Sequence, residues 1–148
     1  AKAILDVAKT LEVLETQGVP VITVGQNSFP AFWSKTSSLK SPLRMDSAAQ
    51  IASAHKTRAM MGLRGGQLIA NPIDAADEIP AEQLAPIIQA AQAEADAQGV
   101  KGKEVTPFLL QRIFELTEGR SLTANIALVR NNARFAARIS AILAIKDT

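Results

Sequence analysis

Cysteine is absent from the 148 residues of this chain, and histidine occurs only once. The absence of cysteine excludes disulfide frameworks, thiolate metal sites and cysteine nucleophiles. A single histidine without cysteine leaves no spacing that resembles a zinc site, so no metal ligand is assigned to this chain. We expect His55, Glu94 and Asp96 to lie on solvated helix faces rather than in a catalytic site.

Aromatic residues, net charge and long apolar runs are also scarce. Aromatic residues make up 4% of the chain, and 16 Lys and Arg residues against 14 Asp and Glu residues leave a formal net charge of +2. Because the basic residues are scattered, no nucleic-acid partner is expected. No apolar run approaches the roughly 18 residues of a membrane span, so no membrane partner is expected. Acids interrupt the apolar pattern of the first residues, unlike a signal peptide, and a cytoplasmic protein is expected.

The remaining composition is that of a folded chain. Hydrophobic residues make up 47% and charged residues 20%, which is typical of one globular domain. The sequence starts at Ala1 and enters a structured pattern almost at once, whereas a domain normally begins with a few loose residues. We therefore expect a fragment boundary at this end.

Apolar periodicity and capping residues predict five helices. The expected ranges are 6–17, 47–61, 80–97, 107–117 and 122–145. Gly18 stands where a glycine that ends a helix belongs. Thr106 is expected to cap the fourth helix, with Pro107 at its first position, and Ser121 is expected to cap the last helix.

Two runs rich in β-branched or aliphatic residues predict strands at 19–25 and 66–72. Between the first strand and the second helix, residues 26–44 are rich in serine, proline and aromatic residues and are predicted to form a long loop. The alternation of strands and helices indicates an α/β fold. Because two strands are too few for a stable sheet, we expect a segment outside this chain to complete it.

The last predicted helix carries asparagines in an apolar setting. Asn125 and Asn132 are about two turns apart and therefore lie on one face, with Asn131 well around from them. A half-buried amide pair could bind the edge of a nucleobase, because an amide offers both donors and an acceptor. Most buried polar groups are simply satisfied within the fold, however, and the residues alone favour that interpretation.

Lys2 stands in the apolar segment AKAIL at the start of the chain. A desolvated lysine can lose its proton near neutral pH and act as a nucleophile or Schiff-base amine. Since lysine side chains are mostly exposed, the residues alone favour a solvated lysine at this position.

Several sequence blocks, in order along the chain, together resemble one family. They are KAILD (2–6), LEVLETQGVPV (11–21), FPAF (29–32), GGQLIANPI (65–73), AEADAQGVKGKEVTPFLLQRIFELT (93–117) and SLTANIALVRNNA (121–133). These blocks are similar to the pseudouridine-5'-phosphate glycosidases, a family that also includes proteins associated with indigoidine biosynthesis. The resemblance covers nearly the whole chain, and the combination of ANPI, TPFLL and ANIALV-x-NNA is specific.

The resemblance implies an architecture larger than this chain. Family members are about double its length, so residues 1–148 would be the C-terminal half of a single domain. The implied fold is a three-layer α/β/α structure whose mixed sheet is completed by the N-terminal half. The resemblance further implies a homotrimer and a divalent metal, Mn²⁺, bound by residues outside this chain.

The resemblance also implies a reaction, the cleavage of pseudouridine 5'-phosphate into uracil and ribose 5-phosphate. It places the family's Schiff-base lysine at Lys2, which opens the KAILD block, and its uracil-contacting asparagine at Asn125. After the sugar ring opens, the lysine bonds to the anomeric carbon and becomes an iminium there as the base leaves. Protonation of the uracil carbon then releases the base, and water hydrolyses the imine. Asn132 is expected to pack or to add a second hydrogen bond.

The chain departs from the family pattern at two points. Glu118-Gly119 replaces a frequent Gly-Gly pair, which restricts the backbone at that turn. TVGQNS before FPAF lacks the usual acidic and tyrosine-like positions, which leaves open a related C-glycoside-forming or pigment-pathway enzyme. A non-catalytic fragment is the third interpretation. We expect the chain alone to be prone to aggregation, because sheet edges and apolar helix faces would lack cover.

Overall fold

The computed structural model describes residues 6–145. Its elements are α1 (Val7–Thr16), β1 (Val21–Val24), β2 (Leu43–Met45), α2 (Ala48–Met60), β3 (Leu68–Ala70), α3 (Ala81–Ala97), a 3-10 turn η1 (Gly102–Glu104), α4 (Val105–Leu116) and α5 (Arg120–Ala144). All five predicted helices and both predicted strands are present. The α/β class is therefore confirmed. No helix in this part of the chain is long and apolar enough to cross a membrane.

The described strands form one parallel sheet in the order β2-β1-β3. In the central strand, Ile22 faces Leu43 of β2 on one side and Ile69 of β3 on the other. The prediction that residues 26–44 form only a loop was wrong at its end, because Leu43 and Arg44 belong to β2. Three residues are too few to show strand periodicity, and only pairing with β1 makes this segment a strand. The expected mixed sheet concerns strands beyond this chain and stays a prediction.

Helix α1 packs against the sheet through its apolar side. Val21, Phe29 and Ala70 are buried, and they pack against three residues of α1, namely Val7, Leu11 and Leu14. The side chain of Asp6 accepts a hydrogen bond from the Lys9 amide and caps the helix. Gly18 follows the helix with a φ of 65°, which confirms the predicted glycine cap. The described part of the KAILD block thus leads directly into α1.

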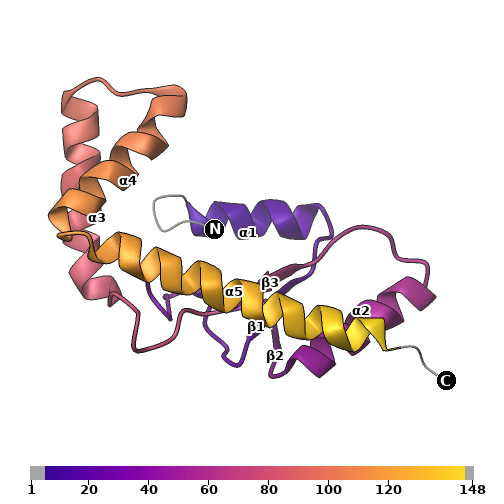
Figure 1. Ribbon diagram of the computed structural model, residues 1–148. Helices are drawn as coiled ribbons and strands as arrows, with labels where there is room; N and C mark the ends of the chain where they lie inside the picture. Colours follow the sequence, from indigo (N-terminus) through magenta and orange to yellow (C-terminus); the bar gives the residue numbers. More distant parts are fainter. Residues whose placement is uncertain (1–5, 146–148) are drawn as a thin grey trace.

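Helices α3 and α4 form an arm that projects from the part of the molecule that holds the sheet (Figure 1). Leu84 and Ala91 of α3 are buried with Leu109 and Ile113 of α4. The same cluster continues along α5 and into the loop that follows β1; its other buried members are Trp33, Ile73, Ile79, Ala95, Ala124 and Leu128. Because one apolar cluster spans the arm, the loop and α5, their relative positions are fixed by packing.

Two predicted helix starts were wrong. The turn η1 runs straight into α4, which begins at Val105 with no side-chain cap, so Thr106 and Pro107 lie inside its first turn. Helix α5 begins at Arg120, after Gly119 with a φ of 82°. Ser121 is therefore the second residue of α5 and is buried. Both helices therefore begin directly after a tight turn of the backbone, without the side-chain cap that the sequence indicated.

Candidate functional site

The loop after β1 is anchored on both sides of its FPAF segment. The Ala31 and Ser34 main chains exchange two hydrogen bonds, of 3.0 and 3.2 Å, around Phe32 and Trp33. This two-residue turn needs a positive φ, and Phe32 adopts one of 59°. A bulky residue at positive φ is a genuine outlier, so the surrounding contacts must hold it there. The Phe32 and Trp33 rings pack edge to face, with their centroids 4.6 Å apart.

Trp33 and Ser34 connect this turn to distant parts of the chain. The Trp33 indole nitrogen donates a buried hydrogen bond of 2.9 Å to the carbonyl oxygen of Ser121 in α5. The Ser34 hydroxyl donates a 2.7 Å bond to the carbonyl oxygen of Ile79, and the Ile79 amide donates to the Trp33 carbonyl. The FPAF segment is thereby held against α5, one helical turn before Asn125.

A cavity of about 280 Å³ lies between this loop, β3 and α5. We call it the asparagine pocket, because amides line it together with a largely apolar wall. Its lining residues are Phe29, Pro30, Phe32, Leu68, Ile69, Ala70, Asn71, Asn125, Leu128, Val129 and Asn132. A small, mostly apolar cavity with a few convergent polar groups is typical of a small-molecule site. It also lies beside the carboxyl end of β3, where ligands of parallel sheets commonly bind.

The amides of the pocket differ in their partners. The Asn71 side-chain nitrogen donates a 3.2 Å hydrogen bond to the side-chain oxygen of Asn132. Asn125 is half-buried and makes no side-chain hydrogen bond to any residue within 6–145. Asn131 points elsewhere, since its side chain donates a 3.2 Å bond to the carbonyl oxygen of Pro72 and lines a separate cavity. The prediction that Asn125 and Asn132 share a face is confirmed.

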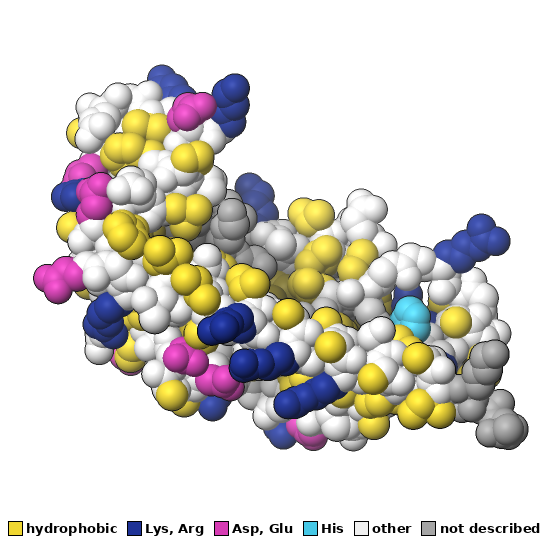
Figure 2. Space-filling view, viewed as in Figure 1, with side chains coloured by type: hydrophobic (Ala, Val, Ile, Leu, Met, Phe, Trp, Pro, Cys, Tyr) yellow, Lys and Arg dark blue, Asp and Glu magenta, His cyan; other side chains and the backbone are white. Residues whose placement is uncertain are grey.

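Asn125 lies where two cavities meet. The second cavity, of about 380 Å³, lies between α4 and the first turns of α5 and is also lined by Trp33, Phe114 and Leu122. Hydrophobic side chains follow α4 and α5 across this face of the molecule (Figure 2). Leu122, Ile126 and Val129 of α5 are each about half exposed. The surface around Asn125 is therefore apolar and open on the side of the second cavity.

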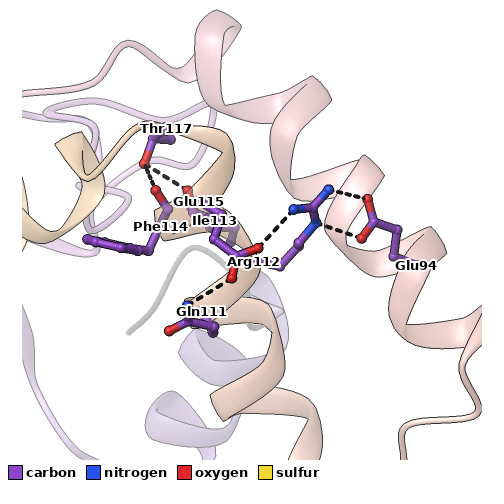
Figure 3. A network of polar contacts seen from close by, with 7 residues as sticks. All are labelled: Glu94, Gln111, Arg112, Ile113, Phe114, Glu115 and Thr117. Atoms are coloured by element: carbon purple, nitrogen blue, oxygen red, sulfur yellow. Dashed lines mark hydrogen bonds and ion pairs between the residues drawn. The ribbon is translucent and has the colours of Figure 1, made fainter.

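A charge network joins α3 and α4 on the arm (Figure 3). The Arg112 guanidinium donates to both carboxylate oxygens of Glu94, at 2.6 and 3.0 Å, and to Glu115 at 2.8 Å. Bonding to Glu94, and then to Glu115, raises the pKa of Arg112. Gln111 and then Arg112 lower the pKa of the Glu115 carboxyl by donating hydrogen bonds to it. The prediction that Glu94 is merely solvated was wrong, because it joins α3 to α4.

The structure brings together only part of the predicted site. Lys2 lies outside the described residues. His55 is exposed on α2, as expected. Sequence reasoning did not include Asn71, Phe29 or Phe32 in a site. Two features of the sequence could have indicated these residues: Asn71 lies at the end of a predicted strand, and FPAF is an aromatic segment in a long loop.

Within residues 6–145 no three His, Asp or Glu side chains come together in a way that could hold a metal ion. The asparagine pocket is lined by amides and apolar groups, none of which carries a charge. These residues do not fit a divalent-metal centre, which needs carboxylate or imidazole ligands.

A family model described as indigoidine synthase A like protein matches residues 1–142. The chain belongs to this family. The indigoidine synthase A-like chain is 73% identical over 143 residues to a pseudouridine-5'-phosphate glycosidase of Roseobacter denitrificans, covering 97% of this chain and 46% of the relative. It is 63% identical over 144 residues to the protein of the same name in Paracoccus denitrificans, covering 97% and 47%. The chain therefore spans about half the length of these curated relatives.

Two solved structures share this fold. A prealnumycin C-glycosynthase, solved in complex with ribulose 5-phosphate, superposes with a TM-score of 0.88 at 31% identity, over 97% of this chain and 47% of that one. An indigoidine synthase A-like protein of Thermotoga maritima superposes with a TM-score of 0.81 at 34% identity, over 94% and 46%. The sheet, the arm and α5 are thus arranged as in these two structures.

Proposed function

We propose that this chain is the C-terminal half of a glycosidase that cleaves pseudouridine 5'-phosphate into uracil and ribose 5-phosphate. The observation that carries the proposal is that nearly the whole chain matches proteins named for this activity. The asparagine pocket supports it, because uracil is a small planar ring whose polar groups all lie on its edge. An apolar cavity with convergent amides has the chemistry that such a ring needs.

In this proposal Lys2 supplies the amine and Asn125 binds the base. The C–C bond has no oxygen or nitrogen leaving group to protonate, so the enzyme must supply electrons to the anomeric carbon as this bond breaks. The lysine amine bonds to that carbon as the sugar ring opens. When the C–C bond breaks, its electrons leave with uracil, whose carbon takes a proton, and the nitrogen lone pair forms the C=N bond. Water then hydrolyses the imine to ribose 5-phosphate and free lysine.

Asn125 would act by orienting uracil and by donating to the oxygen on which negative charge develops. A donor already in place costs no reorganisation during the reaction and is most effective where water is excluded. Asn125 suits this role because it is half-buried beside Phe32 and Leu128, and its amide is not committed to another described side chain.

The rest of the active site belongs to the proposal as well. The acid that protonates uracil and the groups that bind the phosphate would come from the N-terminal half. A divalent metal, Mn²⁺, would also be held there, and no step of the proposed reaction runs through a metal held by residues 6–145. The assembly would be a homotrimer in the cytoplasm.

A second candidate function is formation of a C-glycoside. It is favoured by the similarity to a solved C-glycosynthase and by the departure of TVGQNS from the glycosidase pattern. The higher identity to the glycosidases favours cleavage. Assays of both directions with the same protein distinguish the two functions, since a glycosidase releases uracil from the phosphorylated nucleoside in excess water.

Borohydride trapping tests the proposal directly. The chain is joined to the N-terminal half of its Roseobacter denitrificans relative, incubated with ribose 5-phosphate and reduced. We expect peptide mass mapping to find the reduced sugar phosphate on Lys2. Lys2→Arg abolishes the adduct, whereas Lys9→Arg, which changes an exposed lysine on α1, leaves it intact. An adduct on a different lysine, or none, rejects the lysine mechanism for this chain.

A further inference from the structure

The hydrogen bond between Asn71 and Asn132 joins the end of β3 to the middle of α5, inside the asparagine pocket. It uses one hydrogen of the Asn71 amide and one lone pair of the Asn132 oxygen. The Asn71 oxygen and the Asn132 NH₂ group have no partner among the described residues. Rotation of both amides by 180° reverses the bond but still leaves one free carbonyl and one free NH₂ group.

We infer that Asn71 and Asn132 form an amide pair that binds adjacent N–H and C=O groups on the uracil edge. The inference rests on the proposed function and adds a specificity element to it. The free carbonyl accepts from the ring N–H, and the free NH₂ donates to the neighbouring ring oxygen. A base attached through carbon keeps hydrogen on both of its ring nitrogens. A base attached through nitrogen, as in an ordinary uridine nucleotide, has lost one of these donors.

The surroundings of the pair make such bonds selective. Phe29 and Leu128 are buried and, with the half-buried Phe32, they form an apolar wall of the same pocket. The faces of a uracil ring can pack on such a wall while its edge meets the amides. Asn132 itself is exposed within residues 6–145, so the bonds discriminate where bound uracil and this wall exclude water from the amides, because a ligand that lacks one partner then leaves a protein amide unpaired.

A purely structural role for the pair is already duplicated in the fold. Asn131, the neighbour of Asn132, donates a hydrogen bond to the carbonyl oxygen of Pro72, the neighbour of Asn71. The same two segments are therefore tied twice. Only Asn132 lines the asparagine pocket, whereas Asn131 lines a separate cavity. Asn131 and Asn132 are thus neighbouring asparagines that differ in their access to the pocket.

The test compares Asn132→Ala and Asn132→Asp with Asn131→Ala in the protein of full family length. Uracil binding is measured by calorimetry, and KM and kcat are measured with pseudouridine 5'-phosphate. We expect both Asn132 variants to weaken uracil binding about three- to tenfold and to raise KM by a similar factor. Asn132→Asp keeps the acceptor for Asn71 but replaces the donor NH₂ by oxygen, so a structural clamp would survive in it.

Asn131→Ala should bind uracil as the unchanged protein does. Equal uracil affinity in the unchanged protein and in both Asn132 variants overturns the inference. So does an equal loss in Asn131→Ala and the Asn132 variants. Trapping with ribose 5-phosphate, which contains no base, should give the same adduct in all variants. An unchanged protein that forms no adduct rejects the proposed function, while the calorimetry still decides whether the amide pair binds uracil.

Discussion

Glu118 and its neighbour Gly119 both have a positive φ, of 51° and 82°, in the turn that joins α4 to α5. Glycine adopts this conformation readily, whereas a residue with a Cβ pays roughly 1–2 kcal/mol for it. Glu118 thus stores strain in the turn that sets the direction of α5, the helix that carries Asn125. A glycine at this position would remove that strain.

We expect Glu118→Gly to stabilise the folded protein by about 1 kcal/mol, because relief of the left-handed conformation exceeds the added freedom of the unfolded chain. Urea unfolding followed by circular dichroism measures this change. Gly119→Ala should act in the opposite direction, since an added Cβ would lie 3.4 Å from the Phe114 ring at a φ of 82°. A Glu118→Gly protein with unaltered or lower stability contradicts this view of the turn.

The Glu115 carboxyl should make the stability of the arm depend on pH. Its pKa is lowered in the folded state by hydrogen bonds from Gln111 and then Arg112. A carboxyl with a lowered folded pKa stabilises the fold above its unfolded value, near 4.3, and this contribution is lost as pH falls through the folded pKa. We expect Glu115→Gln to lose stability at neutral pH and to show a shallower decline in acid.

Thermal unfolding of the two proteins from neutral pH to about pH 2 tests this expectation. Glu12→Gln is the matched control, because Glu12 is an exposed acid on α1 with no side-chain partner among residues 6–145. Glu12→Gln should leave the fall in stability at low pH unchanged. If the unchanged protein and Glu115→Gln lose stability equally as pH falls, the network on the arm does not contribute to acid sensitivity.

The apolar face of α5 should make the 148-residue chain self-associate when it is expressed alone. Leu122, Ile126 and Val129 are 49%, 50% and 58% exposed and follow one another at helical spacing. Contiguous exposed apolar surface of this kind favours association. We expect Ile126→Gln to lower light scattering of the isolated chain, and Val13→Gln, at an exposed position on α1, to change it less. A monomeric chain with a cooperative thermal transition would contradict this prediction.

Most of the regular structure was predictable because it depends on local patterns. The five helices and two of the three strands follow from apolar periodicity and from residues that end a helix, such as Gly18. β2 was not predictable, since Leu43–Met45 becomes a strand only through pairing with β1. The starts of α4 and α5 were misplaced because a 3-10 turn and a positive-φ glycine compete with side-chain caps there.

The sequence by itself determined the α/β class, the family and the shared face of Asn125 and Asn132, because these depend on order and spacing along the chain. Only the tertiary structure decided which groups meet. Asn71 reaches Asn132 across 61 positions, Trp33 reaches Ser121 across 88, and Glu94 meets Arg112 between two helices. Such contacts depend on how the apolar faces of the loop, the arm and α5 pack together, and spacing within one segment carries no information about the segment that will face it.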